Sequence, residues 1–542
     1  MRRGRQGQNL ARRRDPANPR LTANSRHRPS KCSYAMPPTR EFASRLLRSA
    51  PDRLEGVVTC VRGECVRRSV VASVLLISAF GLSACGFRPE EGDASKVEAQ
   101  VGWNRESAAQ LKKAIEARAA HGLDRIAFET DAEPGSAEGD ARLTQAALAF
   151  AGALARGVAE PEKLYELYTV PRPRPNLRHD LHVALGSGKL EEWLQSLAPQ
   201  DANYRRLSDQ YLALRKPDTS RKPHIAADAE PIRPGARDPR MAAIARQLIE
   251  YDYLGPQATG DRYTPAIVVA VKKMQADYGI APDGLIGNDA ITILNLSDEE
   301  RARAIAVNME RLRWLDRSSP PTRIDVNLAA ARLSYWRDGK LVDMRRVVVG
   351  RPDRPTPQLG SPIYRLVANP TWTVPRSIQQ KEIALKGPGY LRANNMFWKD
   401  GWIVQGSGPK NSLGRVKFDM SNEHAIYLHD TPAKSLFQMP QRQRSHGCVR
   451  VEDALGFAAL LARDSGIAEQ WQKALASGEE SYVPLPKEIP VRMLYQTVLF
   501  DQSGDPVLRA DPYEWNDRVA ARLGFSPHTT YHLKSGQDDL GP

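Results

Sequence analysis

Cysteine is scarce in this chain, and the positions of the few cysteines matter more than their number. Only five occur in 542 residues, and four of them, Cys32, Cys60, Cys65 and Cys85, lie within the first 85. The rest of the chain contains one thiol, Cys448, which has no partner there for a disulfide. Such a thiol is often an inert core residue, but in an exported protein it is a candidate reactive residue.

Long apolar runs are also missing, which excludes a polytopic membrane protein, and the ordinary apolar content of 41% excludes a wholly disordered one. One uncharged run, Ser69 to Ala84, follows Arg67-Arg68. It is shorter than the roughly 20 residues that a membrane-spanning helix needs, and it fits the apolar part of a secretory signal. A buried helix of a globular domain is the alternative.

The run ends in Leu82-Ser83-Ala84-Cys85-Gly86, which resembles a bacterial lipobox, with Cys85 as the lipidated residue. We therefore interpret residues 57–85 as a lipoprotein signal peptide. A signal normally opens a chain, so residues 1–56 are expected to be a non-native extension or a disordered segment. The expected location is the periplasm, with a lipid anchor in a membrane, and Gly86 after the cysteine favours the outer membrane.

The net charge of +15 raises the question of nucleic-acid binding. Residues 1–68 hold 17 Lys+Arg and 5 Asp+Glu, which leaves a net charge of only +3 for the rest of the chain. The basic excess thus lies in and before the expected signal, and no nucleic-acid partner is expected.

Residues 86–230 are expected to form a helical scaffold domain and linker. Val97 to Ala120 and Leu143 to Leu154 are rich in Ala and Leu at helical spacing, and residues 216–239 are polar and Pro-rich.

Residues 231–298 have a more specific pattern. Thr264-Pro265 predicts a helix start, and an apolar face follows at Ile267, Val271, Met274 and Tyr278. A turn-rich loop, residues 279–287, precedes a short third helix at 290–295. The order resembles the small three-helix peptidoglycan-binding domain of cell-wall enzymes. A helical linker domain without a ligand is the alternative.

Residues 322–484 have the sequence patterns of strands, in contrast to the helical patterns before them. Leu333 to Arg337, Asp338-Gly339 and Lys340 to Val349 predict a hairpin. A mainly β domain is expected, with a late helix at Val451 to Leu461, and residues 485–542 as a C-terminal strand and tail. The segment at about 375–411 has little regular period and contains Trp398.

The residues that can carry chemistry lie in this β domain. His429 and Asp430 end a predicted strand, and Ser445-His446-Gly447-Cys448 follows fifteen residues later. We expect Cys448 in a turn just before a helix N-terminus, where a thiolate is favoured. His429 can act as its base, and the carbonyl or the carboxylate of Asp430 can fix the imidazole tautomer.

Backbone N–H groups of residues 446–448 can stabilise an oxyanion. A zinc site built from His424, His429, His446 and Cys448 is the alternative, but it lacks close ligand pairs.

The pattern H-x15-S-H-G-C-V-R resembles the signature of L,D-transpeptidases with a YkuD-type catalytic domain. Longer stretches resemble the large YcbB-type subgroup: residues 369–375, 408–418, 427–432 and 489–491. The resemblance implies that Cys448 is the nucleophile and His429 the base, that Ser445 and Gly447 shape the turn, and that residues 375–411 are a lid. Arg450 would orient the turn or bind a substrate carboxylate, unless it is a solvated residue at the helix start. Tyr427, Trp372 and Trp398 are expected to contact substrate.

The resemblance further implies a multidomain α+β protein that forms 3→3 crosslinks in peptidoglycan through a Cys thioester. Its partners would be a donor tetrapeptide stem, an acceptor amine and carbapenem-type β-lactams, with neither cofactor nor metal. Two alternatives stay open: an L,D-carboxypeptidase or other Cys hydrolase on the same scaffold, and a non-catalytic wall-anchoring lipoprotein.

Overall fold

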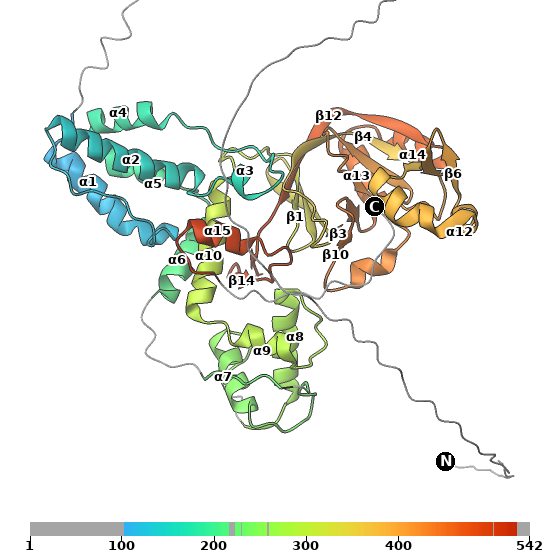
Figure 1. Ribbon diagram of the computed structural model, residues 1–542, viewed down its shortest axis with the longest axis horizontal. Helices are drawn as coiled ribbons and strands as arrows, with labels where there is room; N and C mark the ends of the chain where they lie inside the picture. The colour runs from blue at the N-terminus through green and yellow to red at the C-terminus, as the bar shows by residue number, and fades with distance from the viewer. Residues whose placement is uncertain (1–101, 216–222, 229, 257–259, 502, 528–542) are drawn as a thin grey trace, which may run out of the picture. The chain divides into compact units, whose positions relative to one another are not determined.

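The structure is a computed structural model that describes residues 102–215, 223–228, 230–256, 260–501 and 503–527 (Figure 1). The predicted signal peptide, the extension before it, Cys85 and the end of the expected C-terminal tail lie outside these residues. Within the described ranges, no helix is long and apolar enough to cross a membrane.

The first described region is helical, as the Ala- and Leu-rich spacing predicts. Its first helix starts at a capping box, in which the Asn104 side chain accepts from the Ser107 N–H at 2.8 Å and Ser107 Oγ accepts from the Asn104 N–H at 3.0 Å. The second helix starts at Ser136 and ends at Gly157, whose φ is 83°. The helices are α1 Arg105–Glu116, α2 Ala137–Arg156, α3 Pro161–Leu164, α4 Leu177–Ser187, α5 Leu190–Leu197 and α6 Ala202–Leu214.

A small three-helix unit follows, as predicted. Thr264 is the N-cap of its second helix, Pro265 takes the first position, and Gly279 ends the helix with a φ of 78°. The predicted apolar face is buried within a separate hydrophobic cluster. The amide of Gln275 ties the following loop to the helix, donating to Asp283 Oδ1 and accepting from the Gly284 N–H. The helices are α7 Met241–Glu250, α8 Pro265–Tyr278 and α9 Asn288–Leu294.

A long helix that the sequence pattern did not reveal, α10 Asp298–Arg313, links this unit to the β domain. Arg313 and Glu310 on it are fully buried and paired at 2.6 Å. Glu310 also accepts from the Ala159 N–H at 2.7 Å, and Arg313 donates to the Tyr204 hydroxyl at 2.8 Å. Buried charge is tolerated here because both groups are fully partnered.

The β domain is built on a nine-stranded mixed sheet with the order β10-β3-β11-β9-β8-β4-β12-β1-β2. The predicted Asp338-Gly339 turn joins β2 to β3, and both residues have the positive φ of a type I′ turn, at 50° and 76°. The strands are β1 Arg323–Asn327, β2 Arg332–Arg337, β3 Lys340–Gly350, β4 Gly360–Ala368, β8 Val416–Met420, β9 Leu428–His429, β10 Gln443–Ser445, β11 Val449–Val451 and β12 Ser481–Leu494.

Two expectations about this sheet need adjustment. Strand β12 lies between β4 and β1 and runs through residue 484, where we expected the catalytic region to end. The late helix, α13, spans Ala454–Asp464 and starts three residues after the expected position, because Val449–Val451 forms β11. After it come α14 Ala468–Ala476, β13 Val498–Phe500, β14 Pro506–Leu508 and α15 Asn516–Arg522.

The segment with little sequence period is ordered and has a hydrophobic core of its own. A three-stranded sheet, β5-β7-β6, is combined with α11, a π-helical turn at Gln379–Ile383, a 3-10 turn and α12. We use the name lid for residues 372–413, which contain the segment 375–411 that the family resemblance predicts to be a lid. Figure 1 shows α12 and β6 at the opposite end of the β domain from β1. The bounds are β5 Trp372–Thr373, α11 Arg376–Ile378, α12 Gly387–Ala393, β6 Met396–Lys399 and β7 Trp402–Gln405.

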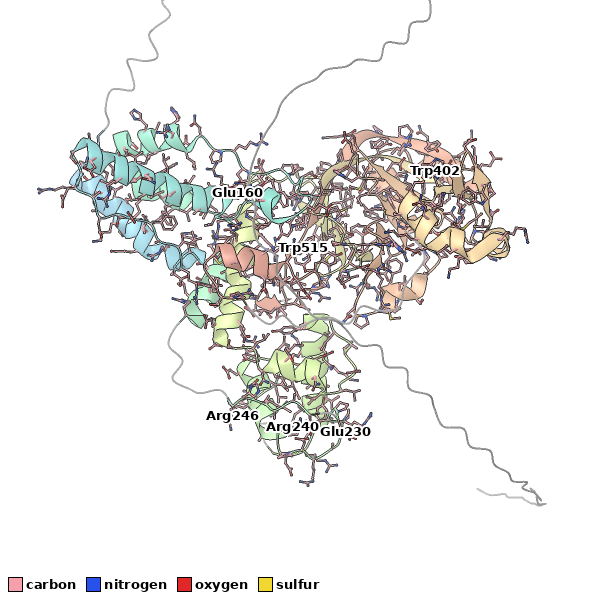
Figure 2. All side chains as sticks on the ribbon, in the orientation of Figure 1. Glu160, Glu230, Arg240, Arg246, Trp402 and Trp515 are labelled. Carbon is pink, nitrogen blue, oxygen red and sulfur yellow. The ribbon has the colours of Figure 1, made fainter. Side chains whose placement is uncertain are left out.

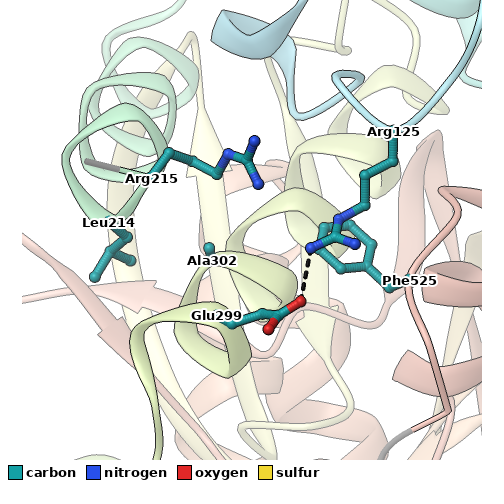
Figure 3. Close-up of a pocket in the computed structure, with 6 residues that line it drawn as sticks. All are labelled: Arg125, Leu214, Arg215, Glu299, Ala302 and Phe525. Carbon is teal, nitrogen blue, oxygen red and sulfur yellow. Dashed lines mark hydrogen bonds and ion pairs between the residues drawn. The ribbon is translucent and has the colours of Figure 1, made fainter. Parts of the chain in front are cut away.

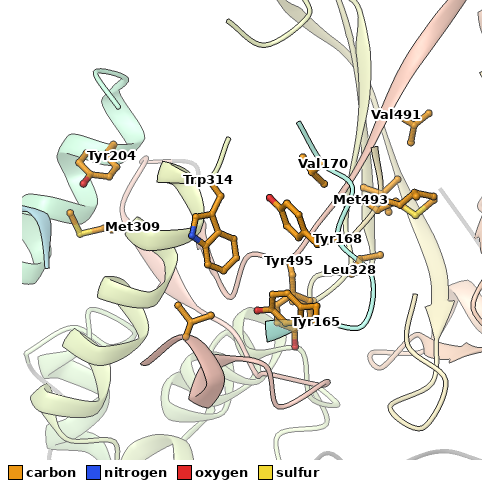
Figure 4. Packing of buried hydrophobic residues seen from close by; sticks show 14 of the residues in the cluster. Tyr165, Tyr168, Val170, Tyr204, Met309, Trp314, Leu328, Val491, Met493 and Tyr495 are labelled. Carbon is orange, nitrogen blue, oxygen red and sulfur yellow. The ribbon is translucent and has the colours of Figure 1, made fainter. Parts of the chain in front are cut away.

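One hydrophobic cluster joins the N-terminal helices to the nine-stranded sheet (Figure 4). Trp314, at the end of α10, packs edge-on against Tyr168 at a ring distance of 6.0 Å. The backbone at Tyr168 forms an isolated parallel β-bridge with Gln358, just before β4, in which the Thr169 N–H donates to the Gln358 carbonyl at 3.0 Å. The helical region therefore supports the β domain through packing and a hydrogen-bonded strand contact.

Candidate active site

Cys448 lies in the short turn between β10 and β11 and is 8% exposed. Our expectation that a helix follows it directly is wrong: β11 follows at Val449, and α13 starts only at Ala454. Val449, Arg450 and Val451 are all buried in the sheet. A helix dipole therefore does not lower the pKa of this thiol.

The strand register brings the candidate base to the same place. In the parallel pair β11–β9, Val449 faces Leu428 and Arg450 faces His429. In the antiparallel pair β8–β9, Lys417 faces His429. Register partners project from the same face of a sheet. The His429 side chain therefore lies between those of Arg450 and Lys417 on one face of the sheet.

His429 is fully buried and held in one tautomer. Its Nδ1 lies 2.5 Å from the Asp430 carbonyl oxygen, so Nδ1–H is the donor. Its Nε2 is buried and has no hydrogen-bond partner among the described residues. The imidazole thus presents an unshared acceptor nitrogen.

The Asp430 carboxylate points elsewhere. One oxygen accepts from the Arg415 N–H at 3.0 Å, and the other pairs with the Lys434 ammonium. Of the two groups that we considered for fixing the imidazole, the structure uses the carbonyl.

Burial and neighbouring charge set the protonation of both candidate groups. Burial, followed by the positive charges of Arg450, Lys417 and Lys434, lowers the pKa of His429 to about 3. Burial raises the pKa of the Cys448 thiol, although Tyr427, Lys417 and Arg450 act in the opposite direction. At neutral pH the resting pair is a neutral thiol and a neutral imidazole.

Tyr427 connects the thiol to the lid. Its phenol interacts with the Cys448 thiol, and burial, followed by that neighbour, raises the pKa of Tyr427 well above its usual value. Its ring lies 5.7 Å from the His429 ring, and Lys417 Nζ lies 4.3 Å from its centroid. It packs against the lid core, which contains the fully buried Trp372.

Side-chain hydrogen bonds fix the backbone of the cysteine turn. Ser445 Oγ donates to the Cys448 carbonyl at 2.6 Å and accepts from the Gly447 N–H at 3.1 Å. Thr356 Oγ1 donates to the Gly447 carbonyl at 2.8 Å. Gly447 has a φ of 124°, which L side chains rarely adopt. Because Ser445 binds the Gly447 N–H, that group is not a free oxyanion donor.

His446 contacts the lid. Its Nε2 lies 3.0 Å from Glu382 Oε1, and Arg354 Nη1 lies 3.1 Å from the same oxygen. Our sequence reasoning missed Glu382, Arg354 and Thr356. The available signal was weak: Glu382 is one of two acidic residues in the basic stretch 375–411.

The remaining predicted site residues are split between buried and exposed positions. Arg450 is 1% exposed, so its interpretation as a solvated residue is wrong. Trp398 is 55% exposed on β6, and His424 is also exposed. Figure 2 labels Trp402 in the same lid, where the guanidinium carbon of Arg376 lies 3.7 Å from its ring centroid.

Among the described residues, no cluster of three His, Cys, Asp or Glu side chains could hold a metal ion. The two arginines in the hollow of Figure 3 are neutralised, with Arg125 2.7 Å from Glu299 and Arg215 2.7 Å from Asp124. That hollow, of about 220 Å³, is lined by Arg125, Leu214, Arg215, Glu299, Ala302 and Phe525.

Three family models match separate parts of the chain. Residues 98–210 match a "Scaffold domain", residues 237–294 a "Putative peptidoglycan binding domain", and residues 321–477 the "L,D-transpeptidase catalytic domain" named YkuD.

A "Putative L,D-transpeptidase" of Haemophilus influenzae is 30% identical over 239 residues, which covers 40% of this chain and 48% of that relative. The chain therefore spans about half the length of this curated relative.

Two solved structures are also similar. The L,D-transpeptidase of Stackebrandtia nassauensis is 14% identical, covers 51% of this chain and 97% of its own, and has a TM-score of 0.21. Residues 123–326 of the L,D-transpeptidase of Xylanimonas cellulosilytica are 16% identical, cover 49% of this chain and 99% of their own, and have a TM-score of 0.19.

Proposed function

We propose that the protein forms 3→3 crosslinks between peptidoglycan stem peptides through a Cys448 thioester, because residues 321–477 match the YkuD family of L,D-transpeptidase catalytic domains. In this proposal Cys448 attacks the carbonyl of residue 3 in a donor tetrapeptide stem. The terminal D-Ala leaves, and an amine of a neighbouring stem then takes the acyl group.

The observation that carries the proposal is the state of His429. Its Nδ1–H is bound to the Asp430 carbonyl, its pKa is about 3, and its Nε2 is an unshared acceptor. The low pKa keeps the imidazole neutral but also makes it a weak base, so the proposal depends on geometry: in this tautomer Nε2 is the acceptor nitrogen that the neutral Cys448 thiol needs.

The proton balance follows from this arrangement. As Cys448 Sγ attacks the carbonyl carbon, its proton moves to His429 Nε2 and the carbonyl becomes an oxyanion. The imidazolium gives that proton to the nitrogen of the leaving D-Ala as the C–N bond breaks. The acceptor amine then attacks the thioester and loses a proton to Nε2, and Cys448 leaves as a thiolate that takes this proton back from the imidazolium.

Surrounding residues have supporting roles in this scheme. Arg450 is buried beside His429, which supports an electrostatic role over direct binding of a substrate carboxylate. Tyr427 lies between the thiol and the lid residue Trp372. Ser445 and Gly447 keep the turn that presents Cys448.

The proposal also includes binding to the cell wall and covalent inhibition. Residues 237–294 would hold the enzyme on peptidoglycan. A carbapenem would acylate Cys448, because its strained amide is an acyl donor of the same class. The cellular setting that we propose is the periplasm, with the lipid anchor at Cys85.

The test is muropeptide analysis of cells that express the wild type, Cys448→Ala, His429→Ala or, as a control at an exposed histidine, His424→Ala. We expect 3→3 dimers with the wild type and His424→Ala and their loss with the other two. Crosslinking that survives Cys448→Ala would overturn the mechanism. Tripeptides without dimers would identify a carboxypeptidase instead.

A further inference from the structure

One carboxylate oxygen connects the lid to the turn that carries the nucleophile. Glu382 Oε1 lies 3.0 Å from His446 Nε2 and 3.1 Å from Arg354 Nη1. His446 is two residues before Cys448, and Arg354 lies in the loop after β3. Three segments that are distant in the sequence therefore meet at one atom.

The contact is shielded from solvent. The side chain of His446 is 3% exposed and that of Glu382 is 18% exposed. A charge-assisted hydrogen bond is stronger in such surroundings than in water, because the local dielectric constant is lower. The contact is therefore able to hold the two segments together.

Glu382 is rigidly mounted on the lid. It lies in the π-helical turn Gln379–Ile383, a rare conformation that is often found at functional sites. Gln379 Oε1 accepts from the Ile403 N–H of β7 at 2.9 Å, and the side chain of Ile383 is fully buried in the lid core. A shift of the lid therefore moves the Glu382 carboxylate with it.

The nucleophile turn needs this restraint. The side-chain hydroxyls of Ser445 and Thr356 donate to the carbonyls of Cys448 and Gly447 and fix them. Gly447 separates His446 from Cys448, and it has no Cβ to restrict the orientation of its neighbours. The side-chain contact of His446 supplies a restraint on the other side of this glycine.

We propose that Glu382 is a positioning residue that acts through His446 to couple the lid to the placement of Cys448 for acylation. This inference rests on the proposed role of Cys448. It predicts that loss of the carboxylate slows the chemical step, while the affinity for the acyl donor stays nearly unchanged.

The experiment measures acylation of the purified full chain by a carbapenem, with intact mass to count labelled protein. The limiting rate and the half-saturating concentration are determined for wild type, Glu382→Ala, His446→Ala and the double variant. Asp400→Asn, which removes the other acidic residue of the lid at an exposed turn, is the matched control. Cys448→Ala shows whether labelling depends on that thiol.

We expect the limiting rate of Glu382→Ala to fall by about 10- to 100-fold, because small misplacements of reacting groups have effects of this size. The half-saturating concentration should change by less than about twofold. The double variant should be slowed by much less than the product of the two single effects, since each single variant already loses the shared Glu382–His446 contact. Asp400→Asn should match the wild type.

A wild-type rate for Glu382→Ala, or a double variant slowed by the product of the two single effects, would overturn the positioning role. If Glu382→Ala does not fold, Glu382→Gln is measured in its place. We expect its limiting rate to be several-fold slower than that of the wild type, and an unchanged rate would contradict the proposal. Wild-type labelling that is lost in Cys448→Ala supports the proposed nucleophile whatever Glu382 does. Absence of wild-type labelling would overturn both.

Discussion

Arg450 and His429 are register partners in the parallel strands β11 and β9, so a buried guanidinium lies beside the imidazole that we propose as the base. The cation disfavours the protonated imidazole and also favours the Cys448 thiolate. One side chain thereby keeps the base neutral and makes the thiol easier to ionise.

Replacement of Arg450 by Met should raise the pKa of His429 from about 3 toward 6.5 and raise that of Cys448 further. The acidic limb of the pH–rate profile for carbapenem acylation should then move to higher pH, since protonated His429 cannot accept the thiol proton. The profile is measured across about pH 3 to 9, so that the wild-type limb near pH 3 falls at its lower end. Arg450→Lys retains the positive charge and should keep the limb near its wild-type position. An unshifted limb in Arg450→Met would exclude this electrostatic role.

The buried neutral histidine also predicts how stability depends on pH. The pKa of His429 is about 3 in the folded protein and near 6.5 in the unfolded chain, so the unfolded state binds more protons between these values. Stability should therefore fall as the pH drops from 6.5 to 3, by up to about 1.4 kcal/mol per pH unit from this group.

Denaturant unfolding of the wild type and His429→Gln at a series of pH values measures that contribution. The slope of the free energy of unfolding should be smaller in the variant. His121, whose pKa burial lowers to about 4, provides a comparison, because His121→Gln should remove a separate contribution that ends nearer pH 4. Identical slopes in wild type and His429→Gln would contradict a buried neutral His429.

The sequence predicted the parts of this fold that depend on local chemistry. The Asp338-Gly339 turn, the Thr264-Pro265 helix start and the three fold regions are confirmed, because each has a short-range signal that tertiary contacts did not override. The fifteen residues between His429 and Ser445 match the spacing in the motif of a known family. This match, which does not depend on periodicity, predicted that the two residues belong to one site.

The remaining features depend on contacts that local pattern does not encode. Val449–Val451 is too short a strand to show a period, so the helix that follows was placed too early. Glu382 lies 64 residues before His446, and the hydrogen bond of Thr356 spans 91 residues. Helix α10 was missed because its buried charges, such as Glu310 and Arg313, make it resemble a solvated segment.

Asp430 offers a direct test of how the imidazole is oriented. A carboxylate that orients a catalytic histidine typically contributes about 10⁴-fold to the rate, as its replacement by Asn shows. Here the backbone carbonyl of Asp430 holds Nδ1, while the carboxylate binds the Arg415 N–H and Lys434. Asp430→Asn should therefore keep the acylation rate within about tenfold of wild type and lower the stability by about 1–2 kcal/mol.

Acylation kinetics and denaturant unfolding of the same preparation separate these two effects. Lys434→Met removes the same ion pair from its exposed end and should affect acylation even less. A loss of about 10⁴-fold in Asp430→Asn would show that the carboxylate orients the histidine during the reaction, against the geometry described above.

The backbone conformation of Gly447 predicts that Gly447→Ala and Gly389→Ala, although chemically similar, have opposite effects. Gly447 has a φ of 124°, where an L residue is strained, although a Cβ would meet only Ile426 Cδ1 at 3.7 Å. Gly447→Ala should therefore cost about 1–3 kcal/mol of stability from backbone strain, or relax the turn and displace Cys448. Either result slows acylation. Gly389, in α12, has open space around its Cα and a φ outside the left-handed region.

Gly389→Ala should therefore be neutral or stabilising, by up to about 1 kcal/mol, because alanine has the higher helix propensity. Thermal unfolding and carbapenem acylation of both variants give the comparison. If Gly447→Ala were as stable and as reactive as Gly389→Ala, the cysteine turn would not need the backbone conformation seen here. Its two carbonyl contacts, from Ser445 and Thr356, would then not determine the position of Cys448.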